Sequence, residues 1–222
     1  MDYLSSLNEE QQRAVTFSGK HALVIAGAGT GKTRTIIHRA VHLLSQGVRP
    51  DKILILSFTR KSANEIVERI KQLQDTGSVL NLSGQTFHSW CSHIIKNNPQ
   101  VFEQHDYTLL DSEDVDSLFK LLFTQKYKNN KTIDQKLYSK IQLVYSYMIN
   151  TRKPLIEAVK IQECRNMSED EASEYIKHNE PVFKEIMRDY IAYKKKNKLF
   201  DYDDLLNITA NGLQQNKEAG KF

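Results

Sequence analysis

Short apolar runs alternate with helical repeats over the first hundred residues of this 222-residue chain. The runs are Ala22 to Ala26, Ile53 to Phe58, and Val79 to Leu82, which leads into Gln85. The first two are each followed by apolar positions at helical spacing, namely Ile36, Ile37, Ala40, Val41, Leu43 and Leu44, then Ala63, Ile66, Val67 and Ile70. The short apolar runs themselves are typical of buried strands. The order predicts an α/β fold with a parallel sheet, whose ligands bind beyond the carboxyl ends of the strands.

From about Ser112 to Lys198 helical spacing replaces the strand pattern, which predicts an all-α insertion. Between Ser117 and Lys160 nine basic residues stand against two acidic ones. Four tyrosines interleave with these lysines: Tyr127, Tyr138, Tyr145 and Tyr147. Basic and aromatic residues mixed in this way are typical of a surface that follows a nucleic-acid backbone. A solvated helical face with its tyrosines in the core is the alternative interpretation.

The composition, 40% hydrophobic and 26% charged, is that of a globular protein and excludes collagen-like, wholly disordered and disulfide-scaffold classes. Only Cys91 and Cys164 are present, too far apart in sequence for a Cys-x-x-Cys metal site. The first residues resemble no secretory leader, and no apolar run approaches the roughly 18 residues of a membrane span. We therefore expect a cytoplasmic protein without a membrane partner. The formal net charge of +4 is only a weak indication of polyanionic partners.

The segment Ala26-Gly27-Ala28-Gly29-Thr30-Gly31-Lys32-Thr33 follows the first predicted strand and opens a predicted helix. Glycines in this position let backbone N–H groups turn toward phosphate oxygens, and the helix N-terminus adds a favourable dipole. Lys32 is placed to neutralise the β and γ phosphates, and the Thr33 hydroxyl to ligate the bridging Mg²⁺. Ala26 occupies the first glycine position of the strict phosphate-loop pattern. The segment predicts binding of a nucleoside triphosphate with Mg²⁺.

Six segments occur in the order of known motifs and span nearly the whole chain: Leu7 to Val15, Ala26 to Arg34, Ser57 to Glu65, Gln85 to His88, Leu110 to Asp114, and Phe200 to Leu206. Together they resemble the UvrD/Rep/PcrA-like superfamily 1A DNA helicases. The resemblance implies a RecA-like P-loop NTPase parallel sheet, incomplete in this chain, with an inserted all-α subdomain. It assigns residues 1–109 and 199–222 to the ATP-binding domain 1A and residues 110–198 to the helical subdomain 1B.

The same resemblance implies that ATP is held by Gln11 and by the loop residues Ala26, Gly27, Ala28, Gly29, Thr30, Gly31, Lys32, Thr33 and Arg34. A glutamine amide can pair bidentately with adenine N6 and N7, so Gln11 is expected to select the base. Arg34 is expected to line the adenine side of the pocket. Lys32 and Thr33 would carry the catalytic contribution of this segment, with Thr33 as the Mg²⁺ ligand.

Contacts to single-stranded DNA are implied for Phe58, Thr59, Arg60, Thr86, Phe87 and His88. Phe58 would stack on a base, an interaction worth roughly 1–3 kcal/mol. The threonine hydroxyls and the imidazole would contact phosphate, and Phe87 a sugar or base. Arg60 stands where the family more often has asparagine, which adds positive charge to the expected DNA path.

Phosphoryl transfer also needs a strand-end carboxylate for Mg²⁺, a residue that orients water, and usually an arginine finger. The sequence offers no clear candidate for these. Asp203 and Asp204 follow no apolar strand, and Asp201 is better placed as the N-cap of a helix containing Leu205, Leu206 and Ile208. We therefore expect the chain to stop before the acidic box of the family and to hydrolyse ATP very slowly or not at all.

The sequence thus predicts the ATP-binding and single-strand-binding N-terminal portion of an ATP-dependent DNA helicase. The family implies 3′ to 5′ polarity, binding at duplex junctions, and repair or recombination proteins as further partners. We expect the fragment to be a monomer. Two alternatives stay open at this point: a nucleic-acid-binding module with a vestigial nucleotide site, and another phosphate-loop enzyme such as a kinase.

Overall fold

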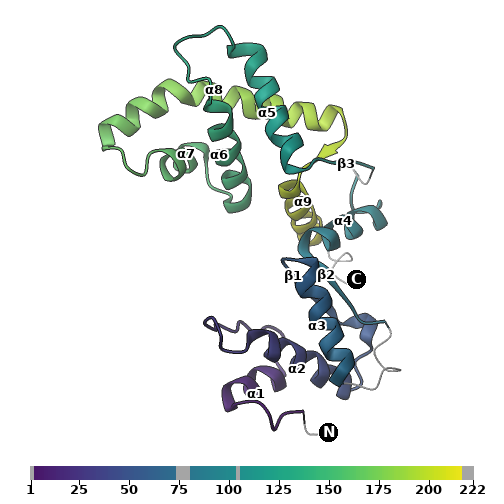
Figure 1. Cartoon of the computed structure of the whole chain (residues 1–222). Helices are drawn as coiled ribbons and strands as arrows, with labels where there is room; N and C mark the ends of the chain where they lie inside the picture. Colours follow the sequence, from purple (N-terminus) through teal and green to yellow (C-terminus); the bar gives the residue numbers. More distant parts are fainter. Residues whose placement is uncertain (1–2, 74–80, 104–105, 217–222) are drawn as a thin grey trace. The chain divides into compact units, whose positions relative to one another are not determined.

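The computed structural model describes residues 3–73, 81–103 and 106–216 (Figure 1). The chain forms two compact units, Met1–Trp90 and Cys91–Phe222. The division between them falls inside helix α4, which runs from Phe87 to Asn97. The boundaries between domain 1A and subdomain 1B, expected at residues 109/110 and 198/199, stay predictions.

The first unit contains helices α1 (Glu9–Thr16), α2 (Lys32–Ser45) and α3 (Arg60–Leu73), the 3₁₀ turn η1 (Pro50–Lys52), and strands β1 (Leu54–Ser57) and β2 (Ser83–Thr86). Helix α1 begins with a capping box, in which Asn8 and Gln11 satisfy each other's backbone N–H groups. Helix α2 begins at Lys32, directly after the glycine-rich loop. The predicted order of loop and helix is therefore confirmed for this segment.

Strands β1 and β2 pair in parallel, with Leu54 opposite Ser83 and Ser57 opposite Thr86. Helix α3 connects them and packs against both. Strand β2 lies close to α3 at Gly84, where an added Cβ would lie 2.6 Å from the backbone oxygen of Ala63. Residues that share a small core hold the layers together: Ile37, Ala40, Val41, Ile55, Ile66, Val67, Ile70 and Leu82. The predicted β–α–β order with a parallel pair is confirmed here.

The predicted strand Ala22 to Ala26 is absent from the structure, where this segment has no regular secondary structure. Its apolar side chains are exposed, with Leu23 at 87% and Ile25 at 90%. An apolar run adopts strand geometry only when a neighbouring strand takes up its backbone hydrogen bonds. In the described residues the sheet of this unit comprises β1 and β2 alone. Val79 and Leu80, predicted to precede β2, lie outside the described residues.

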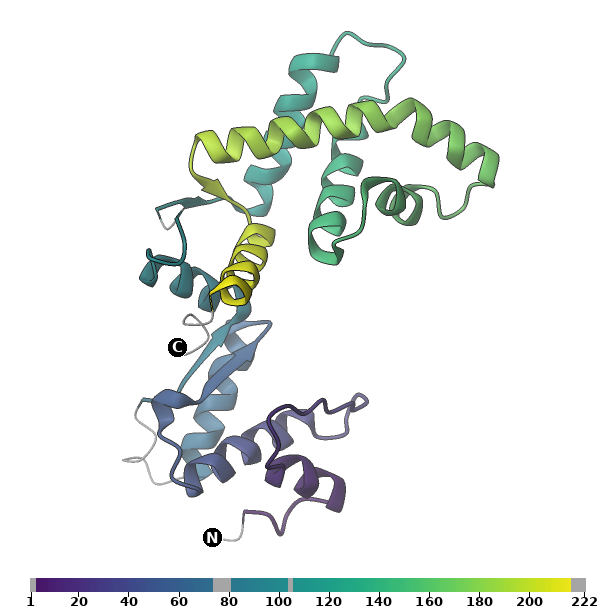
Figure 2. The same cartoon turned by 180° about the vertical axis from the view of Figure 1, so that it is seen from behind.

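The second unit is built mainly of helices: α5 (Ser112–Tyr127), α6 (Leu137–Thr151), α7 (Leu155–Glu163), α8 (Glu169–Lys196) and α9 (Tyr202–Gln215). Helix α8 runs across α5 and α6 in both views (Figures 1 and 2). Two short strands, β3 (Thr108–Leu109) and β4 (Leu199–Phe200), pair in parallel on either side of α5 to α8 in the sequence. Among the described helices, none combines the length and the apolar character needed to cross a membrane.

The core of the second unit explains the tyrosines of the basic segment. Tyr145 is buried, and Tyr127, Tyr138 and Tyr147 are partly buried against the same cluster. Around them pack the largest fully buried side chains of the unit, including Phe119, Phe123, Phe183, Ile141, Ile186 and Tyr190. The alternative interpretation, a helical core pattern, is confirmed for Tyr145, and the partial burial of the other three tyrosines favours it. Of the basic residues, Lys126 pairs with Glu185 and Asp189.

Candidate phosphate loop and nucleic-acid surface

The glycine-rich loop makes its turn through two residues with left-handed backbone conformation. Gly29 has φ +78° and Gly31 has φ +86°, values that side-chain-bearing residues rarely adopt. Gly31 is also the N-cap residue of α2, and it has no side chain to accept from the first backbone N–H groups of the helix. An anion near these N–H groups would be favourable.

Lys32 lies within this bend. Its Nζ donates to the carbonyl oxygen of Gly27 at 2.7 Å and approaches that of Ala26 at 3.4 Å. The Thr30 hydroxyl donates to the same Gly27 oxygen at 2.9 Å. These contacts place the positive charge among the loop carbonyls rather than on the outer face of α2. Thr33 and Arg34 lie on the first turn of α2 and are exposed. Ala28, in the loop, is exposed as well.

Gln11 joins α1 to this loop. Its Nε2 donates to the Thr30 carbonyl oxygen at 3.0 Å, and its Oε1 accepts from the Asn8 N–H at 3.2 Å. Gln11 therefore lies beside the loop, and its expected selection of adenine stays a prediction. Asn8 is the residue that sequence reasoning missed, although its spacing of three from Gln11 is the signature of a capping box.

The carboxyl ends of β1 and β2 bring Phe58 and Phe87 together. Their ring centres are 5.6 Å apart and the ring planes are tilted by 46°. Phe58 is 91% exposed and Phe87 38% exposed. An exposed aromatic pair at a strand edge is a surface on which a flat apolar group can stack.

The threonines beside these rings cap the helices that follow. The Thr59 hydroxyl accepts from the Ser62 N–H at 3.1 Å, and the Thr86 hydroxyl accepts from the Ser89 N–H at 3.1 Å. Each hydroxyl also contacts the serine Oγ at 2.9 Å. Phe58 lies between β1 and the capping Thr59, whereas Thr86 is the last residue of β2 and Phe87 is the first residue of α4. Arg60 is exposed at the first position of α3, and His88 is half-buried at the second position of α4.

One buried histidine lies on α2 behind the loop. His38 is 7% exposed, and its Nδ1 has no hydrogen-bond partner among the described residues. Burial lowers the pKa of His38, a hydrogen bond that the ring donates to the Tyr3 backbone opposes this, and the nearby Arg34 charge lowers the pKa further. The ring is therefore held neutral as a packing residue of α2.

Comparison with known proteins assigns the family. Residues 7–222 match the model of the UvrD/REP helicase N-terminal domain, which covers nearly the entire chain. The chain belongs to this family. The resemblance inferred from the motifs is thereby confirmed.

Among its relatives, the chain is 31% identical over 224 residues to the ATP-dependent DNA helicase PcrA of Staphylococcus aureus (strain Mu50 / ATCC 700699), covering 99% of the chain and 28% of PcrA. It is 29% identical over 215 residues to the ATP-dependent DNA helicase Rep of Buchnera aphidicola, covering 96% of the chain and 31% of Rep. A probable DNA helicase II homolog of Mycoplasma capricolum is 29% identical, with 97% of the chain and 28% of that protein covered. The chain thus spans less than a third of the length of these relatives.

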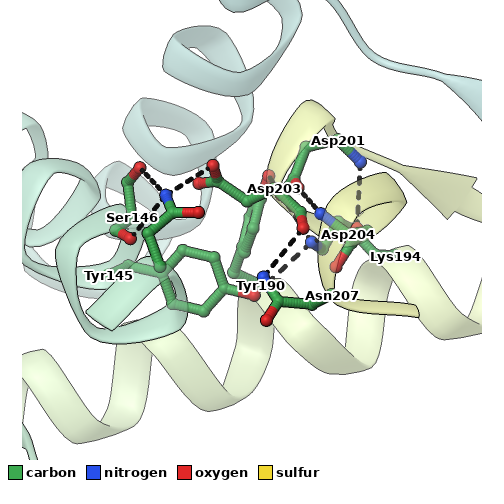
Figure 3. Close-up of polar contacts among 9 residues, drawn as sticks. Tyr145, Ser146, Tyr190, Lys194, Asp201, Asp203, Asp204 and Asn207 are labelled. Atoms are coloured by element: carbon green, nitrogen blue, oxygen red, sulfur yellow. Dashed lines mark hydrogen bonds and ion pairs between the residues drawn. The ribbon is translucent and has the colours of Figure 1, made fainter. Parts of the chain in front are cut away.

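Within this helicase-family chain, an ion cluster fixes the start of α9 to the end of α8 (Figure 3). Lys194 Nζ lies 2.5 Å from Asp201 Oδ2 and 2.6 Å from Asp204 Oδ2. The Tyr190 hydroxyl donates to the same Asp201 oxygen at 2.8 Å, and the rings of Tyr145 and Tyr190 flank the ammonium at 5.4 and 4.6 Å. Lys194 is only 4% exposed. The cluster is a buried structural element that sequence reasoning missed, because a lysine run at a helix end is ordinarily solvated.

Electrostatics in the cluster differ between its two carboxylates. Burial opposes ionisation of Asp201, but the charge of Lys194 and its hydrogen bond outweigh it and hold the Asp201 pKa below its usual range. Burial raises the pKa of Asp204, and the neighbouring Asp201 charge adds to that rise against the effect of Lys194. Burial also raises the pKa of Tyr190 far above the ordinary range, so its hydroxyl remains a donor.

The cluster also settles the local role of Asp201 and its neighbours. Asp201 is the N-cap of α9, accepting from the Asp204 N–H at 2.8 Å, as predicted. Leu205, Leu206 and Ile208 lie within that helix, also as predicted. Asp203 Oδ1 accepts from the Asn150 side-chain amide at 2.7 Å. The Asp203 and Asp204 carboxylates both make contacts inside the second unit, shortly after β4.

Proposed function

We propose that this chain is the ATP-binding and single-stranded-DNA-binding portion of an ATP-dependent DNA helicase. The observation that carries the proposal is the position of Lys32, whose ammonium lies inside a glycine bend at the N-terminus of α2. A cation, open backbone N–H groups and a helix dipole then act on the same small volume, which favours a polyphosphate. Membership of the helicase family and the printed activity of Rep and PcrA support ATP as the nucleotide and DNA as the track.

In this proposal the loop residues Ala26 to Gly31 surround the phosphates, and Lys32 neutralises the β and γ groups. The donor set fits Mg²⁺, because Thr33 presents an exposed hydroxyl one residue after Lys32, and hard oxygen ligands suit this ion. When bound, Mg²⁺ would neutralise charge that develops on the transferred phosphoryl group. Arg34, exposed on the next position, would line the side of the site toward the base.

Single-stranded DNA would lie across the carboxyl ends of β1 and β2. Phe58 and Phe87 supply adjacent exposed rings for base stacking, and Arg60 adds a positive charge beside them. The hydroxyls of Thr59 and Thr86 already cap helices, so we assign them first to aiming the two rings and only secondarily to phosphate contact. His88 stands next to Phe87 and completes the proposed surface.

The 222-residue polypeptide is expected to bind ATP with slow or absent turnover. In the described part of the first unit, Asp51, Glu65 and Glu68 form surface ion pairs with Arg49, Arg69 and Lys71. None of these carboxylates follows a strand that ends at the loop. Robust DNA-stimulated ATP hydrolysis by this polypeptide would contradict the expectation.

The test is the substitution Lys32→Ala, with Lys20→Ala as a matched exposed control in the same unit. A charge-assisted hydrogen bond contributes roughly 1.5–3 kcal/mol, so Lys32→Ala should weaken MgATP binding by about tenfold or more. Single-strand affinity, measured by fluorescence anisotropy, should stay within about twofold. If wild type binds single strands and shows no saturable MgATP binding, the chain is a nucleic-acid-binding module with a vestigial nucleotide site. Phosphate transfer to nucleosides would instead indicate a kinase.

A further inference from the structure

We propose that Ser89 is a positioning residue of the single-strand surface, because it fixes the backbone turn from which the Phe87 ring projects. The inference rests on the proposed function, since it concerns how that surface is shaped to receive bases. Ser89 lies on the first turn of α4, two residues after Phe87. It is given no contact with nucleic acid of its own and acts through the ring.

The Ser89 hydroxyl is joined to Thr86 by three hydrogen bonds. Its Oγ accepts from the Thr86 N–H at 3.0 Å and from the Thr86 hydroxyl at 2.9 Å, and it donates to the Thr86 carbonyl oxygen at 3.1 Å. The Ser89 N–H in turn donates to the Thr86 hydroxyl oxygen at 3.1 Å. This is the reciprocal pattern of a capping box, in which a side chain on the first helical turn returns to the backbone of the capping residue. Thr86 is therefore held at both its N–H and its carbonyl group.

Phe87 lies inside the turn that these bonds close. It is the first residue of α4, it follows Thr86 directly, and its ring is exposed beside that of Phe58. An exposed ring has few packing contacts to hold it, so its direction depends on the backbone that carries it. Helix ends fray, and a side-chain cap stabilises the first turn against this. The box at Ser89 thereby keeps the Phe87 ring next to Phe58.

The turn after β1 provides a natural comparison. Ser62 stands three residues after Thr59, as Ser89 stands three residues after Thr86. Its N–H donates to Thr59 Oγ at 3.1 Å, and the two hydroxyls are 2.9 Å apart. Both contacts end on the Thr59 side chain, and in the described part of the chain none joins Ser62 Oγ to the Thr59 backbone. Phe58 also precedes its capping threonine, so its ring lies outside the capped turn.

The experiment measures the affinity for a labelled oligothymidine by fluorescence anisotropy at one fixed salt concentration. It compares Ser89→Ala with Ser62→Ala, which removes the same hydroxyl from the equivalent position without freeing a backbone N–H group. Ser89→Thr is the conservative variant, because it keeps the hydroxyl. Ser89→Ala is also made in a chain that carries Phe87→Ala, so that the two changes form a double-mutant cycle.

If Ser89 positions the ring, Ser89→Ala weakens oligothymidine binding by about fivefold, while Ser89→Thr and Ser62→Ala stay within about twofold of wild type. In the Phe87→Ala chain, Ser89→Ala should change the affinity by less than about twofold, because the ring through which it acts is gone. Equal losses in both chains would indicate a merely structural effect and overturn the proposal, as would wild-type affinity of Ser89→Ala. Failure of the wild-type chain to bind oligothymidine would instead overturn single-strand binding as a function, and this inference with it.

A second measurement needs no nucleic acid and shows whether the turn itself has loosened. The backbone ¹⁵N order parameters of Phe87 and His88 should fall toward about 0.6 in Ser89→Ala, against about 0.85 for a rigid backbone in Ser62→Ala. A fall confined to the first turn of α4, with the rest of the first unit unchanged, also separates this effect from unfolding. Equal order parameters in the two variants would overturn the proposal.

Discussion

The rings of Phe58 and Phe87 lie 5.6 Å apart because Ser57 and Thr86, the residues before them, are opposite each other in the parallel β1–β2 pair. Both strands end at the same edge of the sheet, and the next helix is capped by Thr59, two residues after β1, and by Thr86, the last residue of β2. The two aromatic residues are therefore placed by strand register rather than by contacts of their own. Phe58 does not fill the core, since it is 91% exposed.

Phe58→Ala should weaken binding of an oligothymidine by about 1–3 kcal/mol, or roughly five- to hundredfold, through loss of base stacking. Leu54→Ala is the control, because Leu54 is a 45% exposed apolar residue at the other end of β1. Fluorescence anisotropy titrations at one fixed salt concentration measure both. Equal affinities for Phe58→Ala and wild type would remove the stacking surface from the proposal.

Lys194→Met should destabilise the second unit by about 3–5 kcal/mol, because it leaves Asp201 and Asp204 buried without their cation. Lys195→Met is the matched control, since Lys195 is exposed on the next position of α8 and its replacement should cost less than about 0.5 kcal/mol. Hydrogen exchange of the α9 amides and urea unfolding report the loss. A stability change as small as that of the control would mean that the cluster contributes no net stabilisation.

Gly84→Ala should destabilise the first unit by about 1–3 kcal/mol, because the new Cβ would lie 2.6 Å from the Ala63 backbone oxygen and force α3 away from β2. At Gly27 the nearest atom to an added Cβ is 3.6 Å away, so Gly27→Ala serves as the control for stability alone. Hydrogen exchange across α3 compares the two variants. Unchanged exchange in Gly84→Ala would contradict the tight packing of α3 on the sheet.

Stability of the first unit should decrease as the pH falls below about 6.5, the ordinary histidine value. Burial lowers the pKa of His38 in the folded state, so the unfolded chain binds the proton more readily and is favoured in acid. His38→Gln removes this titration, and its unfolding free energy should change less between pH 7.5 and pH 5.5 in parallel urea titrations. Identical pH slopes for the variant and wild type would exclude His38 as the source.

Local chemistry made part of this structure predictable from the sequence. The start of α2 at Lys32 follows from the glycines before it, and Asp201 was identified as an N-cap from its spacing to the apolar positions of α9. Both depend on residues within one or two turns of each other. The family could be inferred for a similar reason, since each motif is contiguous in sequence.

Long-range pairing was harder to predict. The run Ala22 to Ala26 has the composition of a buried strand, but strand formation depends on a neighbour that the run itself does not encode. The burial of Tyr145 could not be decided from the sequence, because helical spacing alone does not tell which face is buried. The burial of Lys194 could not be predicted from its own helix. It depends on Asp201 and Asp204, which lie beside Lys194 only because the chain reverses at β4.

The short β3–β4 pair has a consequence for how such a chain can change over evolution. Leu109 and Phe200 are register partners, so the chain leaves for α5 and returns from α8 at neighbouring points. Segments whose ends already meet can be lengthened, trimmed or exchanged at small entropic cost to the scaffold that carries them. The loops of the helical stretch between these two residues can therefore diversify while its attachment points, and the Lys194 contacts to Asp201 and Asp204, stay constant.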